Sequence, residues 1–257
     1  MPPALPLDPA AGLGDYLPMA RKPKIPPPPA AVPLKARVKS ALVKGAAGVA
    51  GLFAALILLF SFVPPPINIY QAGQAWRLGG ITKDWTAWDN IAPVMARSVV
   101  AAEDANFCNH WGFDVAAIKD AVSDGSNRGA STLTQQTVKN VFLWHGRSYI
   151  RKALEALLTP VVEFVWSKQR ILEVYLNIAE FGTGVFGAQA AAKHYFNVDA
   201  ADLTAAQAAR LAAVLPDPQG REPTANSSFM RKRTASIISG AETIAADGRA
   251  RCFEWRQ

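Results

Sequence analysis

The longest run of apolar positions in the chain covers residues 45–63, GAAGVAGLFAALILLFSFV, and it contains no charge and no proline. A helix of about 20 residues crosses the hydrocarbon core of a bilayer, so this run is long enough for a membrane span. The PPP sequence at 64–66 then ends the helix, because proline lacks the amide hydrogen that a helix needs. We therefore predict one transmembrane helix over 45–63. The alternative, a cleaved signal peptide, is disfavoured because the run is long and begins far from residue 1.

Beyond residue 90, apolar positions recur at the spacing of amphipathic helices, about 3.6 residues. The segments that follow this pattern are 91–104, 114–122, 131–142, 148–166, 167–181, 184–196 and 203–215. We see no alternating run typical of a strand that competes with them, and we predict a mainly α domain over 90–250. Residues 64–89 show no clear pattern and are interpreted as a linker or stalk.

Several of these segments begin with residues that cap helices. The capping candidates are Asp114, the pair Thr132 and Gln135, and the pair Thr204 and Gln207. Pro160 lies inside segment 148–166 and is expected to kink or break that helix.

Residues 1–44 form a basic tail without a periodic apolar pattern. Eleven of the 19 prolines lie in the first 33 residues, which is typical of an extended or disordered segment. The tail carries seven Lys and Arg residues against two acids, whereas the first charge after the span is Arg77. Because basic flanks stay on the cytoplasmic side, we expect a single-pass protein with a cytoplasmic N-terminus and with residues 64–257 outside.

This asymmetry changes the meaning of the net charge of +7. The tail accounts for +5, and residues 64–257 contain 20 basic and 18 acidic residues, which leaves only +2. The excess of basic residues therefore mainly reflects the signal that orients a membrane protein. We exclude nucleic acid as a partner.

The two cysteines, Cys108 and Cys252, both follow the predicted span. In an oxidising compartment a disulfide and two free thiols are equally compatible with the sequence. The three histidines, at 110, 145 and 194, lie far apart, and the chain contains neither CxxC nor HExxH. No metal site is predicted.

Two neighbouring carboxylates, Glu103 and Asp104, end the first helical segment after residue 90. Each residue of a helix advances by about 100°, so Glu103 lies near the apolar face beside Val99, while Asp104 lies over Arg97. An apolar surrounding that includes Phe107 disfavours the charged form of a carboxylate and raises its basicity. Glu103 is therefore the candidate general base. A plain structural role at the helix end is the alternative.

Polar groups with one spacing follow, at steps of four or eight residues: Ser131, Lys139, Arg147, Arg151 and Glu155. Such steps return to nearly the same side of a helix, and converging Lys and Arg near a helix N-terminus favour a phosphate or diphosphate. Taken singly, Ser131 is better explained as a cap, and Arg151 with Glu155 as a surface pair. Together with Glu103 they indicate a base opposite a cationic site for a leaving group.

These motifs resemble the peptidoglycan glycosyltransferases of family 51, and within it the monofunctional biosynthetic peptidoglycan transglycosylases. The resemblance covers about residues 80–240 and rests on five stretches: EDANFCNHWGFD (103–114), RGASTLTQQTVKN (128–140), RKALE (151–155), SKQRILEVYLNIAEFGTGVFGAQAAAKHYF (167–196) and LTAAQAARLAAVLPDP (203–218). Long motifs in the right order are a specific signal, unlike a lone short pattern.

The resemblance implies a lysozyme-like, mainly α glycosyltransferase domain with a small hydrophobic subdomain that associates with the membrane. It implies polymerisation of lipid II into β-1,4-linked glycan strands with inversion and release of undecaprenyl diphosphate. The expected location is the inner membrane, with the catalytic domain in the periplasm. The expected partners are lipid II, nascent glycan, membrane lipid, and cell wall synthesis or division proteins. No cofactor is evident, although a divalent Mg²⁺ or Mn²⁺ ion suits diphosphate chemistry.

The resemblance also implies a role for each matching residue. Glu103 matches the catalytic base that takes the proton from the acceptor 4-hydroxyl, and Glu155 matches a second glutamate that orients the donor or assists its departure. Lys139, Arg147 and Arg151 match cations that meet the diphosphate, and Ser131, Gln135, Gln136 and Asn140 match polar groups that line the cleft. Asp104, Phe107 and His110 match residues that shape the site. Phe142, Leu143 and Trp144 either face the membrane or belong to the core.

Three other functions compete with this interpretation. In a lysozyme-like lytic glycosidase, Glu103 would act as a general acid on an existing glycan, but such a site needs no diphosphate-binding cations. A bifunctional penicillin-binding protein is disfavoured because the chain contains no SxxK motif and we expect no room for an acyl-transfer domain. A non-catalytic membrane scaffold would tolerate the loss of Glu103.

Overall fold

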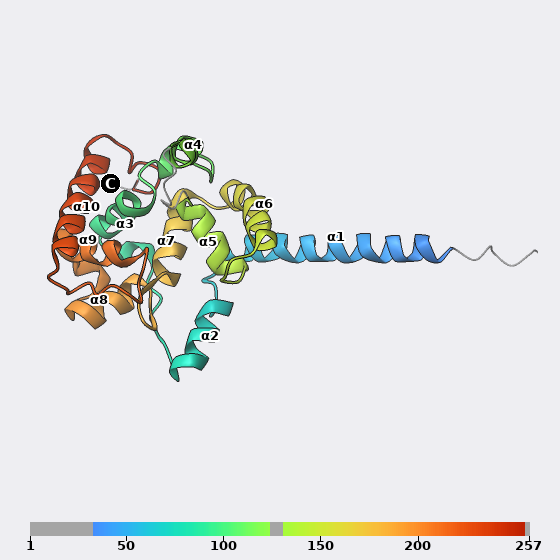
Figure 1. Cartoon of the computed structure of the whole chain (residues 1–257), viewed down its shortest axis with the longest axis horizontal. Helices are drawn as coiled ribbons and strands as arrows, with labels where there is room; N and C mark the ends of the chain where they lie inside the picture. Colours follow the sequence, from blue (N-terminus) through green and yellow to red (C-terminus); the bar gives the residue numbers. More distant parts are fainter. Residues whose placement is uncertain (1–32, 124–130, 255–257) are drawn as a thin grey trace, which may run out of the picture. The chain divides into compact units, whose positions relative to one another are not determined.

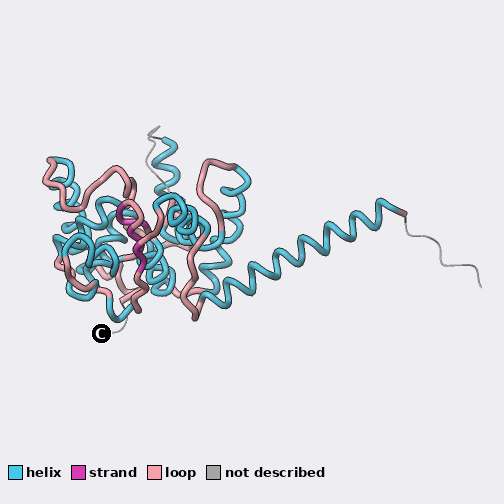
Figure 2. Tube along the Cα trace, turned by 90° about the horizontal axis from the view of Figure 1, so that it is seen from below, coloured by secondary structure: helices cyan, strands magenta, loops and turns pink. Residues whose placement is uncertain are grey.

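A computed structural model describes residues 33–123 and 131–254. The proline-rich segment up to residue 32 and the first three residues of the 128–140 motif lie outside the described residues. The described chain is mainly helical, with one small sheet (Figure 2), so the predicted mainly α class is confirmed. The chain divides into two units, Met1–Ala47 and Gly48–Gln257. The second unit contains the domain considered below.

The elements have the following bounds. In chain order they are α1 (Leu34–Phe60), α2 (Ile69–Leu78), β1 (Thr82–Lys83), η1 (Trp88–Asn90), α3 (Pro93–Glu103), η2 (Phe107–Asn109), α4 (Val115–Ser123), α5 (Leu133–Phe142), α6 (Tyr149–Val165), α7 (Lys168–Ile178), β2 (Glu180–Gly182), β3 (Val185–Phe186), α8 (Ala188–Phe196), η3 (Ala200–Asp202), α9 (Ala205–Val214) and α10 (Ser228–Ala246), where η marks a short 3-10 helix.

Helix α1 starts eleven residues before the apolar run that begins at residue 45. Residues 34–44 contain no proline or glycine and are rich in Lys, Arg, Ala and Leu, which propagate a helix well. Among the described residues, α1 is the one helix that is long and apolar enough to cross a membrane. Near its C-terminal end, Trp166 donates to the carbonyl of Ile57 at 2.7 Å, and Arg170 donates to that of Phe60 at 2.9 Å. These bonds fix the end of α1 to the domain.

Residues 64–89, expected to form a linker or stalk, contain α2 and β1 and pack on the domain. Helix α2 begins with a capping box of Asn68 and Gln71, a signal that the sequence analysis missed. Gln71 is fully buried, and Tyr70 donates to the carboxylate of Glu180 at 2.6 Å. These polar contacts hold the segment against the sheet.

The core lies where α3, α9 and α10 pack together (Figure 1). Helix α9 contributes the fully buried alanines 208, 209, 212 and 213, and such small side chains let neighbouring helices approach closely. The sequence analysis predicted α3 and α9 but not α10, whose segment mixes charged, hydroxyl and apolar residues without a clear stripe. Its buried side chains, Met230, Ile237 and Ile244, lie on one face of the helix all the same.

A three-stranded sheet with the order β1-β3-β2 was not predicted, because its strands are only two or three residues long. Strand β3 pairs parallel with β1 and antiparallel with β2. Helix α7 therefore ends at Ile178, before the expected end at 181. Gly187 follows β3 with φ +91°, and a Cβ there would lie 3.0 Å from the carbonyl oxygen of Asn177. Only glycine fits this close approach.

The helix starts near the candidate site follow the predicted caps. Thr132 and Gln135 form a capping box on α5, Thr204 and Gln207 form one on α9, and Asp114 accepts from the Ala117 amide at 2.9 Å. Helix α6 continues through Pro160 up to Val165, so of the two expected outcomes, a kink or a break, the break does not occur. Proline removes one backbone hydrogen bond of the helix, and the turns on either side persist.

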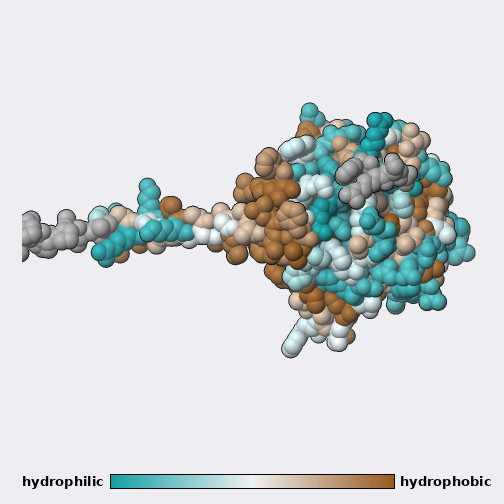
Figure 3. Space-filling model, turned by 180° about the vertical axis from the view of Figure 1, so that it is seen from behind, coloured by the Kyte–Doolittle hydropathy of each residue, from teal (hydrophilic) through white to brown (hydrophobic). Residues whose placement is uncertain are grey.

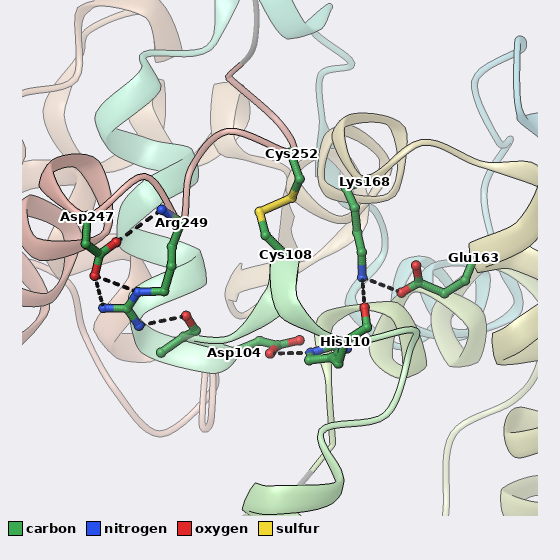
Figure 4. Close-up of a disulfide and its surroundings, with 9 residues drawn as sticks. Asp104, Cys108, His110, Glu163, Lys168, Asp247, Arg249 and Cys252 are labelled. Atoms are coloured by element: carbon green, nitrogen blue, oxygen red, sulfur yellow. Dashed lines mark hydrogen bonds and ion pairs between the residues drawn. A yellow bond between two sulfur atoms is a disulfide. The ribbon is translucent and has the colours of Figure 1, made fainter.

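Cys108 and Cys252 form a disulfide across a sequence separation of 144 residues (Figure 4). It joins η2, directly after α3, to the segment that follows α10. In the same segment Arg249 donates to the carbonyl of Ala105 at 3.0 Å, and Phe253 is buried in the core. The packed chain therefore extends beyond residue 250, the predicted end of the domain.

The outer face of α6 exposes large apolar side chains. Tyr149 is 97% exposed, Ile150 is 72% exposed, and Leu157 and Phe164 are exposed as well. Figure 3 shows a hydrophobic patch on the domain near the C-terminal end of α1. The sequence left open whether Phe142, Leu143 and Trp144 face the membrane or belong to the core. Leu143 is buried, Phe142 packs against Trp166, and Trp144 is 39% exposed.

Candidate active site

Glu103 is the last residue of α3 and faces α5. The side-chain amide of Gln136, on α5, donates to Glu103 Oε2 at 2.9 Å. Glu103 is half-buried and lines a cavity of about 190 Å³, together with Asp114 and Ser131. The carboxylate can therefore reach a hydroxyl group bound in this cavity.

Burial raises the pKa of Glu103 above the ordinary value of a glutamate. The hydrogen bond from Gln136 and the charges of Arg233 and Lys139 oppose this rise in pKa, and the charge of Asp104 adds to it. The sequence analysis expected this direction from the position of Glu103 beside the apolar face. An ionised carboxylate with a raised pKa accepts a proton readily, which suits a general base.

Asp104 connects the first motif to the start of α5. Its Oδ1 lies 2.8 Å from His110 Nε2, and its Oδ2 accepts from the first backbone amide of α5 at 3.0 Å. The predicted position of Asp104 over Arg97 is wrong, because the helix ends at Glu103 and its geometry does not continue to the next residue. Arg97 instead forms an ion pair with Glu254 at 3.5 Å.

Phe107 and His110, from the same motif, form part of a packed loop. The ring of Phe107 is buried, and Lys168 Nζ lies 4.4 Å from its centre. The same ammonium group donates to the His110 carbonyl and to Glu163, both at 2.8 Å (Figure 4). These contacts fix the shape of the loop that follows Glu103.

Helix α6 carries a cluster of opposite charges around Glu155. The carboxylate is buried, with Arg151 Nη1 2.6 Å from its Oε2 and Lys152 Nζ paired with its Oε1. Lys152 also donates to Ser131 Oγ at 3.4 Å, which links α6 to the segment before α5. Both oxygens of Glu155 therefore bind cations.

Lys139, on α5, is close enough to both carboxylates for their charges to affect its pKa. Burial lowers the pKa of Lys139, the charges of Arg151 and Lys152 lower it further, and the carboxylates of Glu155 and Glu103 oppose this fall. The ammonium group thus interacts with both the base and the charge cluster on α6. The structure brings together Glu103, Lys139, Arg151 and Glu155 as the sequence analysis expected.

Three other predicted site residues, Gln135, Asn140 and Arg147, do not belong to this cluster of charges. Gln135 is buried, and its Oε1 accepts from the Thr132 amide at 3.0 Å, so its side chain completes the capping box of α5. Asn140 is half-buried, with Oδ1 2.9 Å from His145 Nε2. Arg147 is exposed on the loop between α5 and α6.

Three further residues at the site, Lys152, Tyr175 and Arg233, were not predicted from the sequence. Tyr175 donates to Gln136 Oε1 at 3.2 Å, which orients the amide so that its nitrogen faces Glu103. Arg233, on α10, donates to a backbone carbonyl of α3 at 2.9 Å and lowers the pKa of Glu103. Only Lys152 had a usable signal, its spacing of one helical turn from a glutamate. The other two come from segments distant in sequence.

Potential metal ligands also meet beside this site. Among the described residues, Asp104, His110 and Asp114 each offer a ligand atom, and these atoms lie within 4.8 Å of one another. The carboxylates already accept hydrogen bonds, because Asp114 caps α4 and also accepts from Asn106 at 3.0 Å. We assign no ion to this group.

The geometry places a basic carboxylate at one wall of a cavity and a group of cations beyond it. A general base can remove a proton from a nucleophile, and Lys or Arg side chains can stabilise an anionic leaving group. The charge cluster also leaves Arg151 and Lys152 anchored by Glu155, so that they can bind a polyanion without moving. This arrangement fits group transfer from a phosphorylated donor.

Comparisons with known proteins give a consistent result. A family model described as Transglycosylase matches residues 73–242. A biosynthetic peptidoglycan transglycosylase of Jannaschia sp. (strain CCS1) is 59% identical over 212 residues, which cover 82% of this chain and 89% of the relative. A protein of the same name from Yersinia pseudotuberculosis serotype O:3 (strain YPIII) is 49% identical over 207 residues, 76% of this chain and 86% of the relative. One from Cronobacter sakazakii is 47% identical over 223 residues, 82% of this chain and 92% of the relative.

Proposed function

Since this chain belongs to the transglycosylase family, we propose that it polymerises lipid II into β-1,4-linked glycan strands and releases undecaprenyl diphosphate. It is a peptidoglycan glycosyltransferase of cell wall synthesis. Family membership also confirms the predicted lysozyme-like fold class. The observation that carries the proposed reaction is the position of Glu103 at the cavity wall with a raised pKa, next to the cations of α5 and α6.

In this reaction Glu103 acts as the general base. It takes the proton from the acceptor 4-hydroxyl, whose oxygen forms a bond to C1 of the donor sugar while the bond from C1 to the diphosphate oxygen breaks. The attack inverts the configuration at C1. Gln136 donates to one oxygen of Glu103, so the other oxygen faces the proton. General base catalysis typically contributes about 10²–10⁴-fold to the rate.

The diphosphate leaves with the bonding electrons and is stabilised by Lys139, Arg151 and Lys152. Arg147, exposed on the adjacent loop, contacts the same group from the solvent side. Glu155 holds Arg151 and Lys152 in place through its two oxygens, and it orients the donor site rather than transferring a proton. Ser131, which accepts from Lys152, extends the same network.

Because α1 is long and apolar enough to cross a membrane, we place the enzyme at the cytoplasmic membrane with α1 as its anchor. The basic residues before the span orient the N-terminus toward the cytoplasm and the enzymatic domain toward the periplasm. The exposed apolar face of α6 then contacts the membrane surface, from which the lipid-linked substrate comes.

A lytic glycosidase is the second candidate, because a carboxyl group with a raised pKa also serves as a general acid. The cation group on α5 and α6 favours synthesis, since hydrolysis of a glycan releases no diphosphate. The names of the relatives favour synthesis as well.

The test is to incubate the purified full chain in liposomes with lipid II and to follow glycan length and free undecaprenyl diphosphate. We expect long glycan from the wild type and at least a hundredfold lower rate from Glu103→Gln. Glu242→Gln, at an exposed position on α10, is the matched control and keeps the full rate. Cleavage of preformed glycan without polymer, or full activity of Glu103→Gln, contradicts the proposed function.

A further inference from the structure

Two aromatic side chains stack between α2 and the loop that joins α5 to α6. The ring of Tyr70, on α2, is centred 3.8 Å from that of His145, with 12° between the two ring planes. The ring of Tyr70 also meets the ring of Phe186, on β3, edge to face at 5.9 Å. Tyr70 therefore lies between the sheet and the loop, and it connects two segments that are far apart in sequence.

The side chain of Tyr70 has a fixed orientation. Its hydroxyl donates to Glu180 Oε2 at 2.6 Å, and the amide of Gln219 donates to the same hydroxyl at 3.2 Å. Burial and the hydrogen bond to Glu180 raise the pKa of Tyr70 to about 12, so the hydroxyl keeps its proton near pH 7. Two hydrogen bonds at the hydroxyl and a ring contact on β3 leave the aromatic ring little freedom to move.

His145 connects this ring to the cation side of the site. Its Nε2 lies 2.9 Å from Asn140 Oδ1 on α5. The carbonyl of the next residue, Gly146, accepts from Arg151 Nε at 3.1 Å, and Nη1 of the same guanidinium binds Glu155. Gly146 has φ +117°, a backbone conformation that other residues rarely adopt. The conformation of the loop at His145 and Gly146 therefore helps to set the position of Arg151.

The loop is exposed and depends on few contacts. Residues 144–147 are all exposed, and the hydrogen bonds that His145 and Gly146 form within the described chain reach only five positions along it. Loops with few buried contacts open at a low cost in free energy. The stack on Tyr70 joins the loop to a distant and fixed segment, so we expect it to narrow the range of loop conformations.

His145 is neutral in this position. Burial, together with the charges of Lys139 on α5 and Arg151 on α6, lowers the pKa of His145 to about 4. At pH 7 the imidazole therefore stacks on Tyr70 without adding a charge that repels the neighbouring cations. Removal of the Tyr70 ring would expose the imidazole to water, and the pKa of His145 should then rise.

We propose that Tyr70 is a positioning residue for the donor, and that it acts by holding His145 and the loop beside the diphosphate-binding cations. The inference rests on the proposed function. A loop that is already ordered reduces the conformational entropy lost when the donor binds. Loss of the stack should therefore weaken donor binding and raise KM, while kcat, which depends on Glu103, changes little.

Two substitutions of Tyr70 test this role, because Tyr70→Leu removes the ring whereas Tyr70→Phe removes only the hydroxyl. We expect Tyr70→Leu to raise KM for lipid II about fivefold, the size expected for one aromatic pair, and to leave kcat within about twofold of the wild type. Tyr70→Phe should keep KM within about twofold of the wild type. Trp76→Leu, at a 92% exposed position on the same helix, is the matched control and leaves KM unchanged.

A double-mutant cycle separates this role from general support of the fold. Because both rings act through one contact, Tyr70→Leu combined with His145→Leu should raise KM no more than about twofold beyond His145→Leu alone. Multiplication of the two single effects overturns the inference. So do equal effects of Tyr70→Leu and Tyr70→Phe, or a Tyr70→Leu enzyme whose melting temperature falls while its KM does not rise. The proposed function then still stands, whereas a wild type that does not polymerise lipid II contradicts the proposed function itself.

A measurement that does not depend on activity follows the titration of His145 in the full chain by NMR. Histidine is isotope-labelled, and His145→Leu assigns the signal. In the wild type this signal should titrate near pH 4. In Tyr70→Leu it should titrate above about pH 5, because water reaches the imidazole while Lys139 and Arg151 still hold the pKa below its ordinary value. The same midpoint in both proteins overturns the inference.

Discussion

The two sides of the site contain one glutamate each, and their surroundings differ. On the base side, Glu103 receives a hydrogen bond from a neutral amide, and burial raises its pKa. On the cation side, Glu155 is buried more deeply but binds Arg151 and Lys152 with its two oxygens. We therefore propose that the same residue type serves as a proton acceptor in one environment and as a fixed anchor in the other. The partner groups, and not burial alone, decide which role a buried carboxylate can take.

The two sides are also held together differently. Contacts between segments far apart in sequence hold the base side: Asp104 binds the start of α5, Cys108 is bonded to Cys252, and Arg249 binds the carbonyl of Ala105. The cation side depends on pairs three or four residues apart within α6. We therefore expect changes on the base side to separate stability from activity, and changes to the ion pairs of Glu155 on the cation side to alter both.

Removal of the disulfide has the largest expected effect on stability. A cross-link that closes a loop of more than 100 residues stabilises by about 4–5 kcal/mol in the chain-entropy model. The double variant Cys108→Ala and Cys252→Ala should therefore melt roughly 10 °C below the wild type, since about 1 kcal/mol corresponds to 2–4 °C at this size. The measurement is thermal unfolding with and without a reductant.

Reduction of the wild type should reproduce the melting temperature of the double variant, and the reductant should not affect the variant itself. Polymerisation by the variant at 25 °C should stay within about threefold of the wild type, because neither sulfur takes part in the reaction. An unchanged melting temperature would show that the other base-side contacts are sufficient.

Glu155→Gln comes next, because it leaves two cations without their carboxylate. Breaking a buried ion pair costs about 3–5 kcal/mol, and we expect roughly 2 kcal/mol here because the Lys152 side chain is 48% exposed. The melting temperature should fall by about 4–8 °C, and kcat/KM for the donor should fall with it. Glu103→Gln should be measured in parallel as the comparison. We expect this variant to lose polymerisation activity without a fall in its melting temperature. A Glu155→Gln enzyme that is slow but as stable as the wild type would place Glu155 in the chemistry instead.

Local patterns in the sequence were sufficient to predict most helices around the site. The capping boxes at Thr132 and Thr204 and the apolar spacing of α3 and α9 depend on neighbours within one or two turns, and the structure confirms them. Helix α10 and the three short strands were missed, because their apolar contacts lie on distant segments. Helix α2 was not predicted for a similar reason. Its residue Gln71 is buried, but a polar glutamine is normally expected to be exposed.

The candidate site divides in the same way. Arg151 and Glu155 share one face of α6, so spacing was sufficient to pair them. Glu103 lies on α3 and Lys139 on α5, and the family resemblance supported their grouping with that pair. Tyr175 comes from α7 and Arg233 from α10, and only the tertiary packing brings them to Gln136 and Glu103. Asp104 was misplaced because the helical geometry was continued one residue beyond the end of α3.

Lys139→Ala should have a smaller effect than Glu155→Gln and should alter function alone. Burial already lowers the pKa of Lys139, so removal of its charge does not weaken the fold. We expect kcat/KM for the donor to fall about tenfold, which is ~1.4 kcal/mol, without a fall in melting temperature. Arg151→Ala is the comparison, because it also frees one oxygen of Glu155 and should lower both quantities. A Lys139→Ala protein with the wild-type rate and a lower melting temperature would contradict the role of Lys139.

The smallest expected effect is a gain of stability in Glu103→Gln, and its sign depends on pH. The pKa of Glu103 is raised in the folded state above its ordinary value of 4.5, so between these two pKa values the folded protein holds more protons than the unfolded chain. The free energy of unfolding therefore falls as pH rises through this window. Glutamine does not ionise and can still accept the hydrogen bond from Gln136, so the variant escapes this loss. Its melting temperature should exceed that of the wild type at pH 7, and the excess should shrink below pH 4.5, where both side chains are neutral. An excess independent of pH, or a lower melting temperature at pH 7, would mean that the protein stabilises the charged form of Glu103, and the base side would then resemble the cation side.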